Sequence, residues 1–332
     1  MPLRSLSFDQ YSDMVVDATV NFLLTGPSIG SWSVGHCALG PIILQFGTEG
    51  GSKVLHGISR PDALLFILQD SQIADRMIFD GEIAQPEEFA VLPPGSNFTI
   101  APQGSHRWMS VAVPVEFFAA HAARTGRGEV ADIVTQKRIV SPPQRLLELF
   151  LSSAASAAAF AREARTPLLD GRAAGLAADL LAALMDAIGG AGRAIAVPTH
   201  HSRSTNVAVT RALEYVRGQN WGGLQVTDMA DAAEVTSRTL LRMFRQQLDL
   251  GPASYLKLRQ LNIVRRELRG KHAPARKITD IMGEHGVTEF GRFASEYKAL
   301  FRERPSDTVA RSRLELERDG FQVETPRRSL RG

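Results

Sequence analysis

Cysteine is nearly absent from this chain of 332 residues, which contains Cys37 alone. A single cysteine excludes an intramolecular disulfide framework and a structural zinc site built from cysteines, and it favours a reducing compartment. The sequence also has no apolar run near the roughly 18 residues that a membrane-spanning helix needs. Because its first ten residues have no hydrophobic core of a signal peptide, we expect a cytoplasmic protein that does not bind membranes.

Motifs for catalysis and metal binding are also missing. No His-x-His pair occurs in residues 1–140, where the histidines stand apart at His36, His56, His106 and His121. No Ser/His/Asp arrangement, glycine-rich phosphate loop or pair of carboxylates has the spacing that an active site needs. We therefore expect no metal, no cofactor and no enzymatic activity.

Charge is distributed unevenly along the chain. Residues 1–205 have 15 Lys and Arg against 19 Asp and Glu, a net charge of −4. Residues 206–332 have 23 against 16, a net charge of +7. A basic C-terminal part favours a polyanionic partner.

The first 140 residues have the texture of short β-strands. Residues 63–68 are an apolar run of strand length, and Asp80-Gly81 between two apolar runs predicts a hairpin. Residues 107–113 alternate before Pro114. Short strands separated by Gly and Pro turns predict an antiparallel barrel or sandwich rather than alternating strands and helices.

Residues 141–190 change to a helical pattern. The apolar positions form one stripe on each predicted helix, at Leu146, Leu147 and Phe150 and at Leu176, Leu180 and Leu184. These stripes either complete the core of the preceding barrel or pack against a second copy of the chain, and we expect the second, a homodimer. Residues 191–205, rich in Gly and small polar residues, predict a linker.

An internal repeat follows the linker. Residues 227–230 recur as 279–282, and after one inserted residue Phe244 matches Tyr297 and Pro252 matches Pro305. Each copy predicts a short helix, a tight turn and a longer helix capped by a threonine, Thr236 in the first copy and Thr288 in the second. Gly286 suits a left-handed turn residue, whereas Glu234 at the equivalent position is strained. Residues 252–268 predict a long helix between the copies, with proline in its first turn.

The repeat resembles the AraC/XylS family of transcription regulators, in which two helix-turn-helix units are joined by one long helix. The motifs that carry the resemblance are residues 235–245, 255–268 and 286–301, followed by Pro305-Ser306. The family usually has glycine where this chain has Glu234, Asp249 and Arg302, and commonly phenylalanine at Val287.

The resemblance implies an α+β protein of several domains. Residues 1–140, with Glu87–Gly95 as a weak match, would form a cupin-like antiparallel β-barrel that senses or dimerises. Residues 141–190 would be a helical dimerisation segment, and residues 206–312 an all-α double helix-turn-helix DNA-binding domain. Residues 313–332 would be a charged tail.

Arginines on the predicted recognition helices are the strongest candidates for reading DNA. Arg238 and Arg242 share one face at i and i+4, and arginine can bind guanine bidentately in the major groove. Arg265, Arg266 and Arg269 fit phosphate or surface roles better, as does Lys298. The candidate DNA-binding residues are Ser237, Arg238, Thr239, Leu241, Arg242, Glu289, Gly291, Arg292, Ser295 and Lys298.

Aromatic residues of the N-terminal part are candidates for binding a small effector, or equally for its core: Trp32, Phe46, Phe66 and Trp108. We therefore expect a sequence-specific transcription regulator, associated with the nucleoid, with double-stranded DNA and RNA polymerase as partners. Two alternatives remain, a metal-dependent cupin enzyme with a DNA-binding tail and an architectural DNA-binding protein without an effector.

Overall fold

The computed structural model describes residues 6–12, 14–27, 30–69, 77–163, 171–191, 200–219 and 223–318. The chain divides by its own contacts into two compact units. The N-terminal unit comprises residues 1–22 and 29–206, and the C-terminal unit comprises residues 23–28 and 207–332. Among the described residues no helix has both the length and the hydropathy that crossing a membrane requires.

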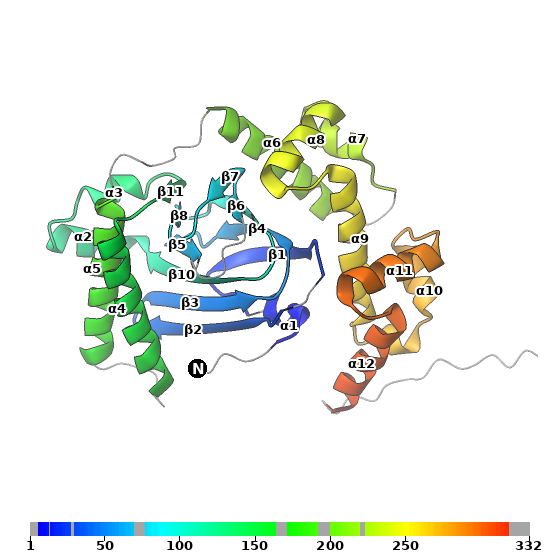
Figure 1. Ribbon diagram of the computed structural model, residues 1–332, viewed down its shortest axis with the longest axis horizontal. Coiled ribbons are helices and arrows are strands. Elements are labelled where there is room, and N and C mark those ends of the chain that lie inside the picture. Colours follow the sequence, from blue (N-terminus) through cyan, green and yellow to red (C-terminus); the bar gives the residue numbers. More distant parts are fainter. Residues whose placement is uncertain are drawn as a thin grey trace, which may run out of the picture. The chain divides into compact units, whose positions relative to one another are not determined.

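Two β-sheets form the centre of the N-terminal unit (Figure 1). The five-stranded sheet has the order β1 (Ala18–Leu24), β4 (Lys53–Ser59), β9 (Asn97–Pro102), β6 (Met77–Phe79) and β7 (Glu82–Ala84). The six-stranded sheet has the order β11 (Arg138–Val140), β8 (Phe89–Leu92), β5 (Ala63–Gln69), β10 (His106–Pro114), β3 (Ile42–Glu49) and β2 (Ser33–Leu39). The antiparallel β-rich fold is confirmed, but the described strands form two sheets rather than one closed barrel.

The predicted hairpin joins β6 to β7. Asp80 and Gly81 have φ angles of 49° and 88°, as the Asp-Gly sequence leads one to expect for a two-residue turn between antiparallel strands. The Asp80 carboxylate also accepts a hydrogen bond from the backbone N–H of Thr99 at 2.9 Å. It pairs with Lys137 Nζ at 2.5 Å as well, so this turn is tied to the rest of the unit.

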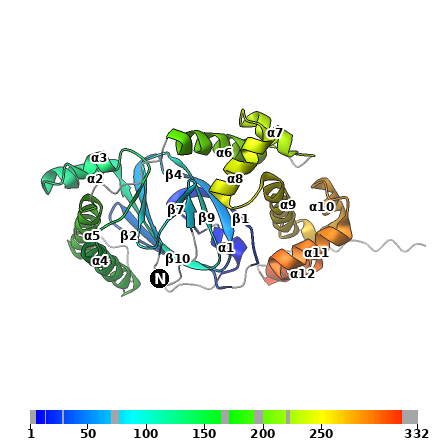
Figure 2. The same ribbon diagram turned by 45° about the horizontal axis from the view of Figure 1, so that its top comes forward.

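The six-stranded sheet lies between the other sheet and a layer of helices (Figure 2). Successive residues of a strand point to opposite faces. On β5, Leu64 and Phe66 therefore belong to the core shared with the helices, whereas Leu65 joins Phe98 and Ile100 in the core between the sheets. Cys37 is buried on the helical side, and this burial raises the pKa of its thiol to about 11.

Helices α4 (Gln144–Glu163) and α5 (Gly171–Gly189) lie side by side against β2 (Figure 1). Their apolar stripes are at most 1% exposed at Leu147, Phe150, Leu180 and Leu184. All four belong to the core under the six-stranded sheet. This corrects the expectation that the stripes pair with a second copy, because they complete the core of their own unit. The shorter helices are α1 (Phe8–Ser12), α2 (Val115–Arg124) and α3 (Val130–Ile133).

The segments expected to be a linker and a tail are only partly described. Residues 192–199 of the expected linker lie outside the described residues, and helix α6 (His200–Gly218) includes its last residues. Helix α12 (Pro305–Arg318) runs beyond residue 312, where the tail was expected to begin. Residues 319–332 lie outside the described residues.

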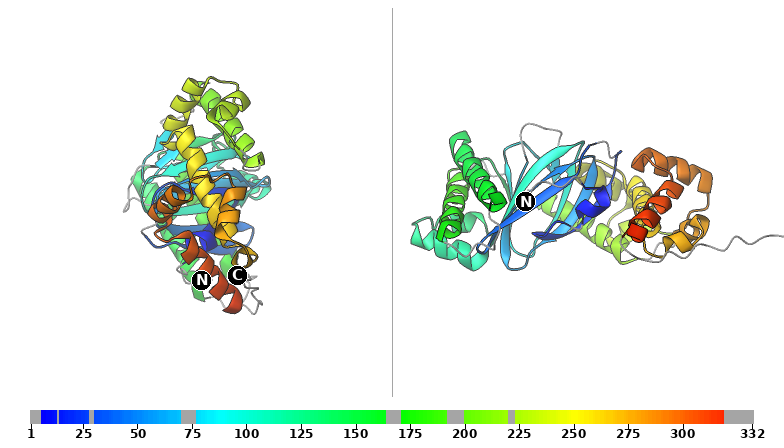
Figure 3. Two further views of the ribbon diagram at one scale, coloured as in Figure 1. Left: turned by 90° about the vertical axis from the view of Figure 1, so that its right-hand side faces the viewer. Right: turned by 90° about the horizontal axis from the view of Figure 1, so that it is seen from below.

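The C-terminal unit contains two helix-turn-helix copies on either side of one long helix (Figure 3). That helix, α9 (Pro252–Leu268), has the predicted bounds, with proline in its first turn. The first copy consists of α7 (Val226–Ala232) and α8 (Ser237–Leu248). The second consists of α10 (Ile278–Glu284) and α11 (Phe290–Phe301), and a 3-10 turn (Ala273–Ala275) precedes it.

Corresponding turns of the two copies have the same left-handed backbone. The residue between the helices has φ 56° at Glu234 and 73° at Gly286. The residue after the second helix has φ 55° at Asp249 and 61° at Arg302. The backbone is therefore left-handed at Glu234, Asp249 and Arg302, the positions where the resemblance to the AraC/XylS family leads one to expect glycine.

The N-caps of the two longer helices differ. The Thr236 hydroxyl accepts a hydrogen bond from the backbone N–H of Thr239 at 3.2 Å, as predicted. The prediction for Thr288 is wrong, because α11 begins at Phe290 and its N-cap is Glu289, without a capping bond from its side chain. The one-residue insertion in the repeat moved the cap by one position.

Candidate nucleic-acid interface and an internal cavity

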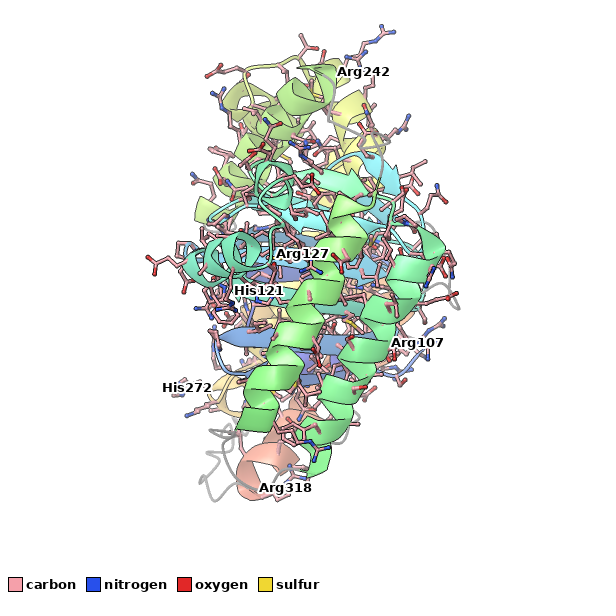
Figure 4. The ribbon with its side chains drawn as sticks, turned by 90° about the vertical axis from the view of Figure 1, so that its left-hand side faces the viewer. Arg107, His121, Arg127, Arg242, His272 and Arg318 are labelled. Carbon is pink, nitrogen blue, oxygen red and sulfur yellow. The ribbon has the colours of Figure 1, made fainter. Side chains whose placement is uncertain are left out.

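Helix α8 separates an apolar inner face from a basic outer face. Leu240, Met243 and Phe244 are buried, and Phe244 packs edge-on against Tyr255 of α9 with ring centroids 5.8 Å apart. Arg238 and Arg242 are exposed. Figure 4 shows the side chain of Arg242 extending away from the ribbon.

The outer face of α8 has no acidic residue. Its sequence SRTLLRMFRQQL contains three arginines and no Asp or Glu. Within the described part of the chain, Arg238 and Arg242 have no ion pair or hydrogen bond through their side chains. Both guanidinium groups keep their donors for an external acceptor, such as a guanine edge or a phosphate.

Helix α11 has a different charge arrangement. Arg292 lies between two carboxylates, with Nη1 3.3 Å from Oε2 of the N-cap residue Glu289 and Nε 3.1 Å from Glu296 Oε1. Glu296 also pairs with Lys257 Nζ of α9 at 2.6 Å. Burial would raise the pKa of Glu296, but the hydrogen bonds from Lys257 and Arg292 outweigh it and lower this pKa. The Arg292 guanidinium therefore already has two carboxylate partners, unlike those of Arg238 and Arg242.

The other candidate DNA-binding residues differ in exposure and in the hydrogen bonds that they already form. Ser237, Gly291 and Lys298 are exposed, and Leu241 is 36% exposed. Thr239 is half-buried, and its hydroxyl accepts a hydrogen bond from Thr236 at 2.9 Å. The Ser295 hydroxyl donates to the carbonyl of Gly291 at 3.0 Å. Thr239 and Ser295 are thus already engaged within their own helices.

Basic residues of α9 do not share one role. Arg265 is buried, pairs with Glu303 at 2.6 Å and lies over the Phe301 ring at 4.6 Å. This corrects the expectation of a phosphate or surface role, because Arg265 joins α9 to the end of α11 and to the turn that follows it. Arg269 pairs with Glu315 at 3.3 Å, whereas Arg266 is exposed.

The N-terminal unit contains a cavity between its two sheets. It has about 50 Å³ of water-accessible space and is partly open to solvent. Of the four aromatic candidates, Trp108 lines it, whereas Trp32 and Phe46 do not. Phe66 points to the helical side and stacks on Phe118 with centroids 6.0 Å apart.

A buried polar cluster lies at the wall of this cavity. Tyr11 Oη donates to Glu49 Oε1 at 2.5 Å, and the indole N–H of Trp108 donates to Tyr11 Oη at 2.7 Å. His106 Nε2 lies 2.6 Å from Glu49 Oε2, and Lys53 pairs with the same carboxylate. Burial opposes ionisation of Glu49, but Lys53 and His106 outweigh it and lower its pKa to about 2. Burial lowers the pKa of Lys53, which the pairing with Glu49 opposes.

A second buried carboxyl group lines the same cavity at Asp17. Burial raises its pKa, and a hydrogen bond from the Ser110 hydroxyl opposes this. The sequence reasoning missed these polar residues. The alternation along β10 could have found two of them, because His106 and Ser110 point to the same side as Trp108. Within the described residues no group of three or more His, Cys, Asp or Glu could hold a metal ion.

The C-terminal helices are similar to those of known helix-turn-helix proteins. Residues 229–311 match the model of a helix-turn-helix domain family. A XylDLEGF operon transcriptional activator of Pseudomonas putida is 28% identical over 111 residues, which cover 33% of this chain and 35% of that protein. The C-terminal unit carries an AraC/XylS-type helix-turn-helix domain. A second P. putida protein of this kind, XylDLEGF operon transcriptional activator 2, is 29% identical over 105 residues, 32% of this chain and 67% of the relative.

This chain matches about a third of the length of the first of these relatives. Among solved structures, the AraC-like transcriptional activator CuxR is 13% identical, with a TM-score of 0.39 and coverage of 80% of this chain and 91% of CuxR. ToxT from Vibrio cholerae, bound to (E)-4-(8-methylnaphthalen-1-yl)but-3-enoic acid, is 10% identical. Its TM-score is 0.31, with coverage of 82% of this chain and all of ToxT.

Proposed function

We propose that this chain is a sequence-specific transcription regulator that binds double-stranded DNA through its AraC/XylS-type domain. The observation that carries the proposal is the outer face of α8, where Arg238 and Arg242 are exposed and have no protein partner among the described residues. Arginine pairs with guanine in the major groove more often than any other residue pairs with a base. Arg238 and Arg242 would therefore read bases.

The second copy would serve mainly as an anchor. Glu289 and Glu296 compete with DNA for Arg292, and the Ser295 hydroxyl is held by its own helix. Lys298 and the exposed Arg266 would contact phosphates, which position the protein without specifying a sequence. Because α9 joins the two copies, they would meet major-groove segments about 10 bp apart on one face of the DNA.

The N-terminal unit would supply regulation rather than catalysis. Its cavity would bind a small effector, and the whole chain would act in the cytoplasm with RNA polymerase as partner and no activity as an enzyme. Metal analysis of the purified protein is expected to find far less than one equivalent.

A homodimer would add paired half-sites and the avidity of two tethered domains. Because the leucine stripes are buried, the dimer contact to test is the outer side of α4, where Leu149 is 53% exposed. Leu149→Glu should then give a folded monomer, which sedimentation would detect. A dimer that survives this change would exclude that contact.

Footprinting on the DNA that flanks the protein's own gene tests the proposed function. A regulator should protect discrete sites, with two protected groove segments per subunit about one helical turn apart. Protection that spreads along the DNA without discrete sites would instead indicate an architectural protein and contradict the proposal.

A further inference from the structure

We propose that the cavity of the N-terminal unit takes an uncharged, largely apolar molecule with one hydroxyl or carbonyl oxygen, and that this oxygen accepts a hydrogen bond from Lys53. The inference rests on the proposed function where it makes this molecule the effector. The binding chemistry itself rests on three features of the cavity: its apolar walls, the open donors of one buried ammonium, and the balance of buried charge.

The walls of the cavity are mainly hydrocarbon. Val20, Leu55, Phe98 and Ile100 line it from the five-stranded sheet, and Leu65 and Ile67 line it from β5 of the other sheet. The cavity has about 50 Å³ of water-accessible space, several times the roughly 10–15 Å³ that one water molecule needs on this measure. Such walls favour an apolar ligand body, since each square ångström of apolar surface removed from water contributes to binding.

Lys53 gives the cavity its donor. The side chain is 1% exposed, and its ammonium has three N–H groups. Its partners are the Glu49 carboxylate and the face of Trp32, whose centroid lies 5.6 Å from Nζ. No other acceptor reaches Nζ from the part of the chain that the structure describes. Buried donors are normally satisfied, so a ligand oxygen fits this position.

The charge around Lys53 favours a neutral ligand over an anion. Glu49 already compensates the ammonium, and it also holds Tyr11 Oη and His106 Nε2. The other carboxyl group of the cavity, Asp17, is buried as well. A ligand carboxylate would place a further negative charge beside Glu49 in an apolar space, where uncompensated charge is costly. A hydroxyl or carbonyl satisfies Lys53 without adding charge.

The test compares head groups on the same apolar skeleton. Alcohols, carboxylates and hydrocarbons of matched linear and cyclic skeletons are titrated into the full chain near neutral pH, with calorimetry and tryptophan fluorescence as readouts. Trp108 lines the cavity, so its emission should respond. We expect the alcohol to bind at least about tenfold more tightly than the hydrocarbon and than the carboxylate of the same skeleton, as one charge-assisted hydrogen bond provides.

Two variants locate the effect. Lys53→Met alone would leave Glu49 buried without its cation, so the double variant Lys53→Met/Glu49→Gln removes both charges. It should bind alcohol and hydrocarbon equally. Leu55→Trp should fill the cavity and weaken all three ligands. Tighter binding of the carboxylate, an alcohol preference that survives in the double variant, or no binding by any skeleton would overturn the inference.

DNA binding is measured on the same samples by footprinting. If the alcohol binds as expected and the footprint does not respond to it, the ligand chemistry stands and its role as an effector falls. If the chain has no discrete footprint at all, the proposed function fails independently of the cavity.

Discussion

The two helix-turn-helix copies share a backbone plan but differ in the charge on their second helices. Left-handed residues occupy the same positions in both. Helix α8 carries three arginines and no acid, whereas α11 pairs Arg292 with Glu289 and Glu296. The difference supports the proposal that both copies share one geometry while only the first has arginines available to read bases.

Loss of one arginine from each copy gives the largest expected contrast. Arg242→Ala should weaken operator binding by about 1–3 kcal/mol, the value of a bidentate base contact. Arg292→Ala should weaken binding much less than Arg242→Ala does, because its guanidinium already forms exposed ion pairs that DNA would have to replace. Titration of the operator by fluorescence anisotropy measures both. Equal losses would remove the distinction between the copies.

Arg266→Ala provides the calibration for a phosphate contact. Arg266 is an exposed residue of α9. Its removal should weaken binding to all DNA sequences alike and lower the slope of log affinity against log salt by roughly one. Arg242→Ala should alter the preference among sequences more than Arg266→Ala does. A change in base preference for Arg266→Ala would show that this assignment is wrong.

The next contrast concerns the free energy of unfolding and compares the threonines Thr236 and Thr288. Thr236→Ala should lower the free energy of unfolding by about 1 kcal/mol, because it removes an N-cap that accepts from Thr239 N–H. Thr288→Ala should leave the free energy unchanged, since the N-cap of α11 is Glu289. Urea unfolding of the full chain, followed by helical circular dichroism, compares the two. A loss at Thr288 as large as at Thr236 would contradict the shifted cap.

Left-handed residues at the ends of the two helices provide a smaller effect. Arg302→Gly should raise the free energy of unfolding by roughly 0.5–1 kcal/mol, since glycine adopts positive φ without the steric cost of a side chain. Asp249→Gly should change it less, because aspartate tolerates this conformation better than arginine does. The same urea experiment measures both variants, and the opposite order would contradict the argument.

The smallest expected effect comes from freeing Arg292. Glu289→Gln removes one of its two carboxylate partners, and exposed ion pairs of this kind contribute little free energy. DNA affinity should therefore rise by a few fold, with a steeper salt dependence. Glu317→Gln, at an exposed glutamate of α12, is the control for net charge. An equal gain in the control would mean that overall charge, not Arg292, causes the effect.

Much of the secondary structure followed from local sequence. The Asp80-Gly81 hairpin, the strand at residues 63–69 and helix α9 all depend on turn chemistry, alternation or helical spacing that a short window contains. The cap at Thr288 was wrong because the repeat shifts its register by one residue within the turn, and the sequence alone does not locate the shift.

The burial of long-range partners could not be predicted in the same way. An apolar stripe on α4 or α5 predicts that one face of the helix is buried. Whether β2 or a second chain buries that face depends on tertiary contacts, which the stripe does not contain. Phe66 and Trp108 both lie on strands, yet only Trp108 faces the cavity. Which face of a sheet meets the cavity is set by register and layer order. The ion pairs of Arg292 could have been predicted from the sequence, since Glu289 and Glu296 stand three and four residues away from it.

One measurement tests the central claim most directly. Binding free energies of the unmodified chain, Arg242→Ala and Arg292→Ala are determined on every single-base variant of the footprinted operator at several salt concentrations. The account predicts that Arg242→Ala loses its preference at one base pair, by about 1–3 kcal/mol, while Arg292→Ala weakens all variants by a similar small amount. Uniform loss for Arg242→Ala, or loss confined to one base pair for Arg292→Ala, would contradict the division between a reading copy and an anchoring copy.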